Sequence, residues 1–330
     1  MNILMLLCGD NLMWTKIGEK VYHPVEMYRS KIFYKRIEVY TNVPLDQYEK
    51  TVVKILKYCN KWGDEEAKEY YKRLNIKYFK LQHDFERGQK TQLKFSVAKQ
   101  ALSKLVAGMS QPFTTVVSTN FAHNLSAPLS QIAFEKSKTS KSAIKLVINM
   151  DYHYDCGDGS SGEKDSVDNG AWGQHHVLKK IKTGNAHVYA TFGVLNEYAP
   201  GGIFIDGEGL QRENISGLDK NSLMNKIESV VKTYKENNFL GVDIYVTVDR
   251  DVLTYGATHF SPGKEERGIV IRTVDPLIAR LRKYGSVNIV GFDITGLPKA
   301  GGEVDPMSAI TNKAACDIND WCGIIQRHMM

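Results

Sequence analysis

The sequence predicts an α/β protein in which a mainly parallel central sheet lies between layers of helices, a three-layer α-β-α arrangement. From residue 112 onward, short runs rich in β-branched residues alternate with longer helical stretches, which is typical of βαβ units. The runs contain few polar residues, as expected of strands buried on both faces. The predicted strands cover residues 114–118, 143–150, 187–191, 242–248 and 286–292.

Helices are predicted between or after these strands, and the first 110 residues add more. The predicted helices of the second part cover residues 126–136, 173–181, 218–237, 274–284 and 306–326. Those of the first part cover residues 45–62, 64–74 and 89–109, after a first buried strand at residues 1–8. No Pro/Gly/Ser-rich linker follows the first part. We therefore expect a single domain of residues 1–330, in which 1–110 form an N-terminal helical elaboration and 111–330 hold the functional core.

The composition excludes several classes of protein. The chain has 330 residues, a formal net charge of +6 and alternating Lys and Glu in residues 64–73, a pattern typical of a solvated helix surface rather than a nucleic-acid interface. Its five cysteines include no CxxC pair, which argues against a disulfide scaffold and predicts a reducing compartment. No apolar run approaches the ~20 residues that cross a bilayer. We expect a cytoplasmic protein that binds neither nucleic acid nor membrane.

Side chains of the kind that bind metal ions follow four of the predicted strands. In chain order they are His123, Asp151, His153, Asp155, Asp249, Asp251 and Asp293. Ligands bind at the carboxyl edge of parallel sheets, and alternate residues of a strand point the same way, so these groups can converge. Crowded carboxylates repel unless cations neutralise them, and carboxylates with imidazoles suit Mn²⁺ better than Zn²⁺. The pattern predicts a divalent metal site; helix-capping carboxylates beside a structural histidine are the alternative for either motif alone.

The order of these motifs resembles the arginase/agmatinase/deacetylase (ureohydrolase) superfamily, which carries Gly-Gly-Asp-His, then Asp-x-His-x-Asp, then Asp-x-Asp. The last two blocks are present, whereas Asn120-Phe-Ala-His123 keeps the histidine of the first block and loses both glycines. The resemblance covers roughly residues 112 to 305 and implies an arginase-like fold with two Mn²⁺ ions per chain. It implies that one metal is bound by His123, Asp151, Asp155 and Asp249, and the other by Asp151, His153, Asp249 and Asp251.

The resemblance also implies hydrolysis of the guanidino group of arginine to ornithine and urea. Two cations would lower the pKa of a bridging water from 15.7 toward about 7 and so supply hydroxide. Asp155 would orient that hydroxide, and His175 or His176 would pass a proton to the leaving amine.

Two departures from the family concern the substrate. Asp293 matches an aspartate of the family's Asp-x-x-Glu pattern, but Gly296 stands where the guanidinium-binding glutamate is expected, and Glu303 is a candidate replacement. Residues 156–165 are glycine-rich and acidic and do not match the pattern of Asn, Ser and Asn residues with which arginases bind the amino acid's α-carboxylate and amine. An open mouth would favour arginine within a peptide, as in the peptide arginases of ribosomal peptide natural-product biosynthesis, to which the chain looks similar. A flexible surface turn is the alternative.

Two other functions stay open at this point. A zinc-dependent deacetylase of the same fold is favoured by the adjacent His175 and His176 and disfavoured by the second set of metal ligands. A non-catalytic binding module is favoured by the lost glycines and glutamate and disfavoured by the retained metal ligands. Related folds commonly form trimers or hexamers, so a homo-oligomer is one option.

Overall fold

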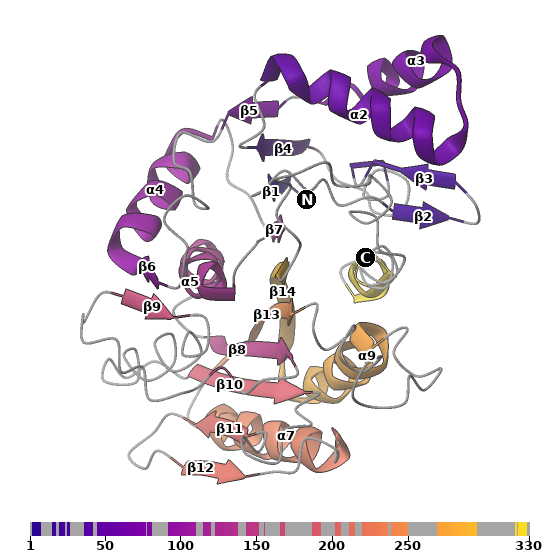
Figure 1. The fold of residues 1–330 in the computed structure, drawn as a ribbon. Helices are drawn as coiled ribbons and strands as arrows, with labels where there is room; N and C mark the ends of the chain where they lie inside the picture. Colours follow the sequence, from indigo (N-terminus) through magenta and orange to yellow (C-terminus); the bar gives the residue numbers. More distant parts are fainter. Residues whose placement is uncertain are drawn as a thin grey trace.

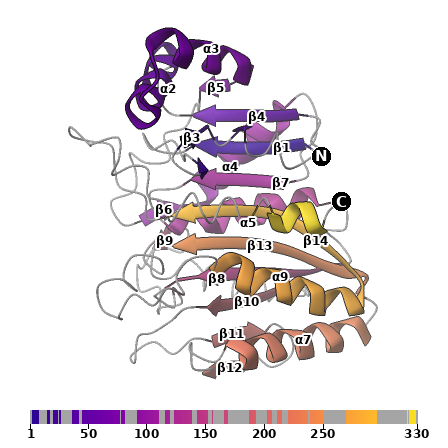
Figure 2. The same ribbon diagram turned by 90° about the vertical axis from the view of Figure 1, so that its right-hand side faces the viewer.

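A ten-stranded sheet forms the centre of the computed structural model (Figures 1 and 2). The structure describes residues 2–7, 15–17, 20–23, 25–26, 36–41, 45–76, 78–80, 92–109, 115–119, 123–137, 143–151, 155, 166–168, 187–192, 202–205, 211–214, 220–236, 239–249, 269–295, 321 and 323–328. The strands of the sheet are β1 (Asn2–Leu7), β4 (Arg36–Thr41), β5 (Tyr78–Lys80), β7 (Thr115–Thr119), β8 (Ala143–Met150), β10 (His187–Phe192), β11 (Gly202–Ile205), β12 (Gln211–Asn214), β13 (Gly241–Asp249) and β14 (Ser286–Thr295). Their order is β12-β11-β10-β8-β13-β14-β7-β1-β4-β5.

The predicted fold class, with a mainly parallel sheet, is confirmed. Every neighbouring pair from β10 to β5 is parallel, and only β11 and β12, at one end of the described sheet, pair antiparallel. In Figure 2 the arrows of β4, β1, β7, β14 and β13 point the same way. Parallel strands therefore deliver their carboxyl ends to one edge of the sheet, which is where ligands bind in such folds.

Helices cover both faces of the sheet. They are α2 (Leu45–Asn60), α3 (Asp64–Leu74), α4 (Phe95–Ala107), α5 (Ser126–Lys136), α7 (Lys220–Glu236) and α9 (Ile269–Leu281). Figure 1 shows the sheet between α4 and α5 on one side and α9 on the other. Alternate strand residues feed two separate apolar clusters, one joining Val147 to Leu129 of α5 and the other joining Val246 to Leu277 of α9. Burial on both faces explains why the core strands are nearly continuous apolar runs.

The first part of the chain supplies strands as well as helices. β1 lies between β4 and β7, and β5 ends the sheet beyond β4. Within the helix predicted for residues 89–109, Gln92–Lys94 form strand β6 instead, and α4 begins only at Phe95. That part of the prediction is wrong because β6 pairs antiparallel with β9 (Ser166–Asp168), a distant partner that local periodicity does not reveal.

The remaining predicted elements differ by a few residues or fall outside the described part. The strand predicted at residues 143–150 and the helix predicted at 126–136 have the observed bounds of β8 and α5. Residues 173–181 lie outside the described residues, and of the helix predicted at 306–326 only 321 and 323–326 are described, all helical. Among the helices described, none is both long and apolar enough to cross a membrane.

Candidate metal centre

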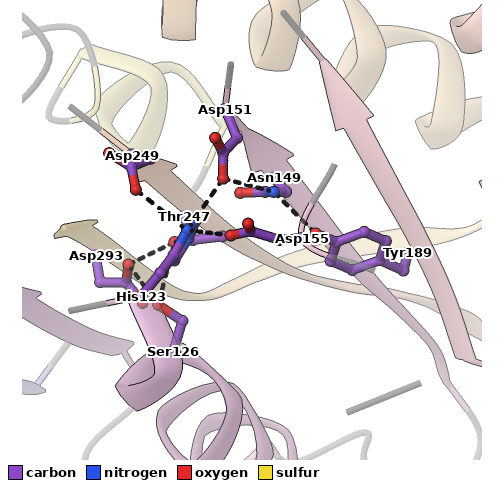
Figure 3. Close-up of polar contacts among 9 residues, drawn as sticks. All are labelled: His123, Ser126, Asn149, Asp151, Asp155, Tyr189, Thr247, Asp249 and Asp293. Carbon is purple, nitrogen blue, oxygen red and sulfur yellow. Dashed lines mark hydrogen bonds and ion pairs between the residues drawn. The ribbon is translucent and has the colours of Figure 1, made fainter. Parts of the chain in front are cut away.

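Four predicted ligands meet at the carboxyl edge of the sheet (Figure 3). His123 is the first residue of the short 3-10 helix η1 (His123–Leu125), directly before α5. Asp151 follows the last residue of β8, and Asp249 is the last residue of the neighbouring strand β13. Asp155 lies four residues beyond Asp151. The adjacent ends of β8 and β13 thus bring together Asp151 and Asp249, which are 98 positions apart in the sequence.

The Nδ1 atom of His123 is the centre of this group. It lies 2.7 Å from Asp155 Oδ2, 3.1 Å from Asp151 Oδ2 and 3.5 Å from Asp249 Oδ2. The potential ligand atoms of His123, Asp151 and Asp155 all lie within 4.8 Å of one another. His123 and Asp151 are fully buried, whereas the Asp249 side chain keeps 19% of its surface exposed. One imidazole facing three largely buried carboxylates is a donor set that suits a hard or borderline divalent cation.

The backbone at Asp155 is held in an uncommon conformation. Its φ of 52° lies in the left-handed region, which aspartate tolerates better than most side chains but still at a cost of about 1–3 kcal/mol. The chain before it is tied to the sheet, since the Asp151 amide donates a hydrogen bond to the Phe192 carbonyl at 3.0 Å. Strain of this kind persists where the surrounding structure holds it, which is a feature of functional sites.

The protonation equilibria reflect the crowding of acidic groups. Burial by itself would lower the pKa of His123, but the carboxylates of Asp155 and Asp151 raise it well above its usual value. Burial and the nearby Asp151 raise the pKa of Asp155 well above the ordinary range, against the opposing effect of His123. Protons are thus held where excess negative charge is gathered. Metal ions compete for the same positions, since ligands must be deprotonated to bind them.

A row of buried polar side chains crosses the sheet on the amino-terminal side of the ligands, two residues before Asp151 and Asp249. The row is formed by register-matched residues of five adjacent strands, in the order Thr191, Asn149, Thr247, Asp293 and Ser118. All five are fully buried. Thr247 lies two residues before Asp249 on β13, and Asn149 lies two residues before Asp151, which directly follows β8, so each is on the same side of the sheet as that ligand. We call this set the polar row.

Two hydrogen-bond paths join the polar row to the ligands. Asn149 Nδ2 donates to Asp151 Oδ2 at 3.3 Å and to the Tyr189 hydroxyl at 2.8 Å. The Thr247 hydroxyl lies 2.8 Å from His123 Nε2 and donates to Asp293 Oδ1 at 2.6 Å. Thr247 contacts His123 at the ring nitrogen opposite the one that faces the carboxylates, whereas Asn149 contacts the Asp151 oxygen that faces His123 Nδ1. Such outer contacts orient metal ligands and tune their affinity.

Asp293 accepts hydrogen bonds from three hydroxyl groups. Ser126 donates to its Oδ1 at 3.1 Å, in addition to Thr247, and Tyr245 donates to its Oδ2 at 2.5 Å. Burial raises the pKa of Asp293, whereas His123 and the three hydroxyls act in the opposite direction. The carboxylate is therefore held deep beneath the cluster by hydroxyl donors. Its predicted role in substrate binding stays a prediction.

Gly291 makes room for the tyrosine that reaches Asp293. A Cβ atom on Gly291 would lie 2.4 Å from Cε2 and 2.5 Å from Cδ2 of Tyr245. We expect Gly291→Ala to displace the ring and to lower the free energy of unfolding by about 1–3 kcal/mol, the usual cost of overpacking a core. Urea unfolding of the metal-free protein measures it. Gly63→Ala is the matched control, because a Cβ there meets nothing within 4 Å; equal losses in both variants would contradict the prediction.

The other predicted site residues lie outside the described part of the chain. They are His153, Asp251, His175, His176 and Glu303, together with Gly296 and the loop of residues 156–165. Sequence reasoning assigned no role to Asn149, Thr247, Tyr189 and Tyr245. A signal for two of them exists: a polar residue two positions before a ligand interrupts an otherwise apolar strand.

No family model matches the chain, and no curated protein matches it significantly in sequence. Several solved structures match it in three-dimensional structure. A hypothetical agmatinase from Burkholderia thailandensis is 15% identical with a TM-score of 0.47, covering 99% of this chain and 86% of that one. Proclavaminate amidino hydrolase from Streptomyces clavuligerus is 16% identical with a TM-score of 0.46, covering 99% and 92%. Formimidoylglutamase from Bacillus subtilis is 13% identical with a TM-score of 0.47, covering 99% and 86%. At these identities and TM-scores, the function follows from this chain's own residues and not from its neighbours.

Proposed function

We propose that this protein is a binuclear metal hydrolase of the ureohydrolase type, which cleaves a C–N bond of a guanidino group. The observation that supports this most is the cluster of His123, Asp151, Asp155 and Asp249, drawn from separate strand ends to one buried point. These four residues are the ones that the resemblance assigns to one of the two metal ions. Without a metal ion, one imidazole alone would have to offset the cost of burying three carboxylates.

Two Mn²⁺ ions are the cofactors we propose. His123, Asp151, Asp155 and Asp249 would hold one ion, and Asp151 and Asp249 would bridge to a second held also by His153 and Asp251. Oxygen-rich donor sets with few imidazoles and no thiolate suit Mn²⁺. When bound, such a pair lowers the pKa of water toward about 7, so that hydroxide is available near neutral pH.

Asp155 is the residue we assign to orient the attacking oxygen. Burial grades across the cluster from Asp151, which is fully buried, to Asp249, which is partly exposed. Substrate would therefore approach from the side of Asp249. Asp155 stands 2.7 Å from His123 Nδ1 with its backbone held in the left-handed region, which limits the positions that its carboxylate can adopt. Water adds its oxygen to the guanidinium carbon, the C–N bond to the side-chain nitrogen breaks, and His175 or His176 passes a proton to the leaving amine.

An arginine side chain within a peptide is the substrate we propose. The loop of residues 156–165 does not match the Asn, Ser and Asn pattern expected to bind a free amino acid, and Gly296 replaces the glutamate expected at the guanidinium. The N-terminal part of the chain also borders the site, since β6 contacts the 3-10 helix that begins with His123.

The test is hydrolysis by the Mn²⁺-loaded full chain. An arginine-containing peptide is expected to release urea and to lose the mass of CN₂H₂ at one arginine, while free arginine and agmatine react more slowly. Metal-free protein is the control. Absence of urea from the peptide, arginine and agmatine together would contradict the proposed function. One zinc per chain with hydrolysis of an acetyl-lysine peptide would point to the deacetylase alternative instead.

A further inference from the structure

The hydrogen bonds of the Thr247 hydroxyl determine which ring nitrogen of His123 carries the proton. The Thr247 hydroxyl carries one proton, and that proton is donated to Asp293 Oδ1 at 2.6 Å. The hydroxyl oxygen also lies 2.8 Å from His123 Nε2 and has lone pairs left to accept. The His123 nitrogen on that side must therefore be the donor. Hydrogen bonding thus assigns Nε2–H to the imidazole, with Nδ1 facing the carboxylates.

Asp293 determines the direction in which the Thr247 hydroxyl donates its proton. Ser126 and Tyr245 also direct their hydroxyl protons at the carboxylate, so all three hydroxyl partners act as donors and Asp293 accepts from each. If Thr247 lacked this strong acceptor, its proton could turn toward His123 Nε2 and select the opposite tautomer. An Nδ1–H imidazole has no lone pair to offer at the position 2.7 Å from Asp155 and 3.1 Å from Asp151.

We propose that Asp293 and Thr247 are positioning residues that hold His123 in the Nε2–H tautomer, so that Nδ1 is the metal-binding atom. This rests on the proposed metal site but not on the identity of the substrate. The arrangement is a buried carboxylate–hydroxyl–histidine chain, built from register-matched residues of β13 and β14 and from the residue that opens η1. Outer partners of this kind set the tautomer and orientation of a metal-bound histidine.

The tautomer can be observed directly in the wild-type protein. Long-range ¹H–¹⁵N correlation spectra of the full chain loaded with diamagnetic Zn²⁺ distinguish the two ring nitrogens, and the His123 signals are assigned by their loss in His123→Gln. We expect a protonated Nε2 and a metal-bound Nδ1. A protonated Nδ1 on His123 in the loaded protein would overturn the proposal, and no variant of the positioning residues is needed to see it.

Substitutions of Thr247 test the path from Asp293. Thr247→Val removes the hydroxyl at nearly constant volume and is expected to raise the Kd for Mn²⁺ about 10–100-fold, the typical cost of losing an outer partner of a metal ligand. Thr247→Ser keeps the hydroxyl and is expected to bind Mn²⁺ nearly as wild type does. Thr191→Val is the matched control, because Thr191 lies in the same polar row, fully buried on β10. Equilibrium dialysis against Mn²⁺ gives all four Kd values.

The possible results separate this proposal from the proposed function. A Thr247→Val protein that folds and binds Mn²⁺ as tightly as wild type would overturn the positioning role, as would equal weakening by Thr191→Val. If Thr247→Val fails to fold, the tautomer of His123 in the spectra of the wild-type protein tests the proposal instead. Wild type that binds metal through Nδ1 but releases no urea contradicts only the proposed function. Wild type that binds no metal overturns both.

Discussion

Asp151→Asn is expected to abolish urea release and to remove the stabilisation by Mn²⁺. Asp151 is fully buried, lies 3.1 Å from His123 Nδ1 and is the proposed bridge between the two metals. Asparagine keeps the shape of the side chain but not the negative charge that offsets a cation. Mn²⁺ at 100 times its Kd stabilises a folded protein by about 2.7 kcal/mol, and this increment should disappear. Thermal unfolding with and without Mn²⁺, together with a urea assay, measures both effects.

A second buried aspartate provides the control. Asp243 is also fully buried and lies on β13, but near the start of that strand, where Asn288 Nδ2 donates to it at 2.9 Å. Asp243→Asn removes the same charge far from the carboxyl edge. We expect it to retain the Mn²⁺-dependent rise in melting temperature. If Asp151→Asn retained that rise as well, or if both variants lost it, the assignment of Asp151 as a ligand would fail.

Trp321→Ala is expected to have the largest effect on stability. Trp321 has no exposed surface and stacks on Phe292, with ring centroids 4.7 Å apart. It belongs to the apolar cluster that also contains Leu277 of α9, so its removal leaves a cavity between the C-terminal helical residues and the sheet. Losing a buried aromatic side chain of this kind costs about 3–5 kcal/mol. Urea unfolding of the metal-free protein gives the value.

The same substitution also tests how the C-terminal residues support the site. Phe292 directly precedes Asp293 on β14, so its packing bears on the strand that carries the polar row. Trp321→Phe retains an aromatic ring and is expected to lose much less stability than Trp321→Ala. A loss below about 1 kcal/mol in Trp321→Ala would mean that the cavity collapses at little cost, contrary to the close packing expected of a protein core.

The core strands and the ligand-bearing strand ends were predictable because their signals are local. Continuous apolar runs identify strands buried on both faces, and a polar residue after such a run lies at the carboxyl edge. β8 and β13, with Asp151 and Asp249 at their ends, follow from this reasoning alone. β4, β5 and β6 did not, because β5 and β6 have only three residues each and all three pair with strands that are distant in the sequence. The three strands of residues 36–94 therefore needed the tertiary structure.

The sequence by itself determined the α/β class, the edge at which ligands gather, and the residue types that meet there. It did so because strand burial and side-chain alternation depend on residues that are neighbours in the sequence. Only the tertiary structure decided which polar residues lie beneath the ligands, since the link from Asp293 through Thr247 to His123 depends on strand register across β14 and β13. It also placed Asp293 among three hydroxyl groups, contributed by residues 46 to 167 positions away. Hydrogen bonds between residues so far apart depend on how the strands are ordered, and no local pattern carries that order.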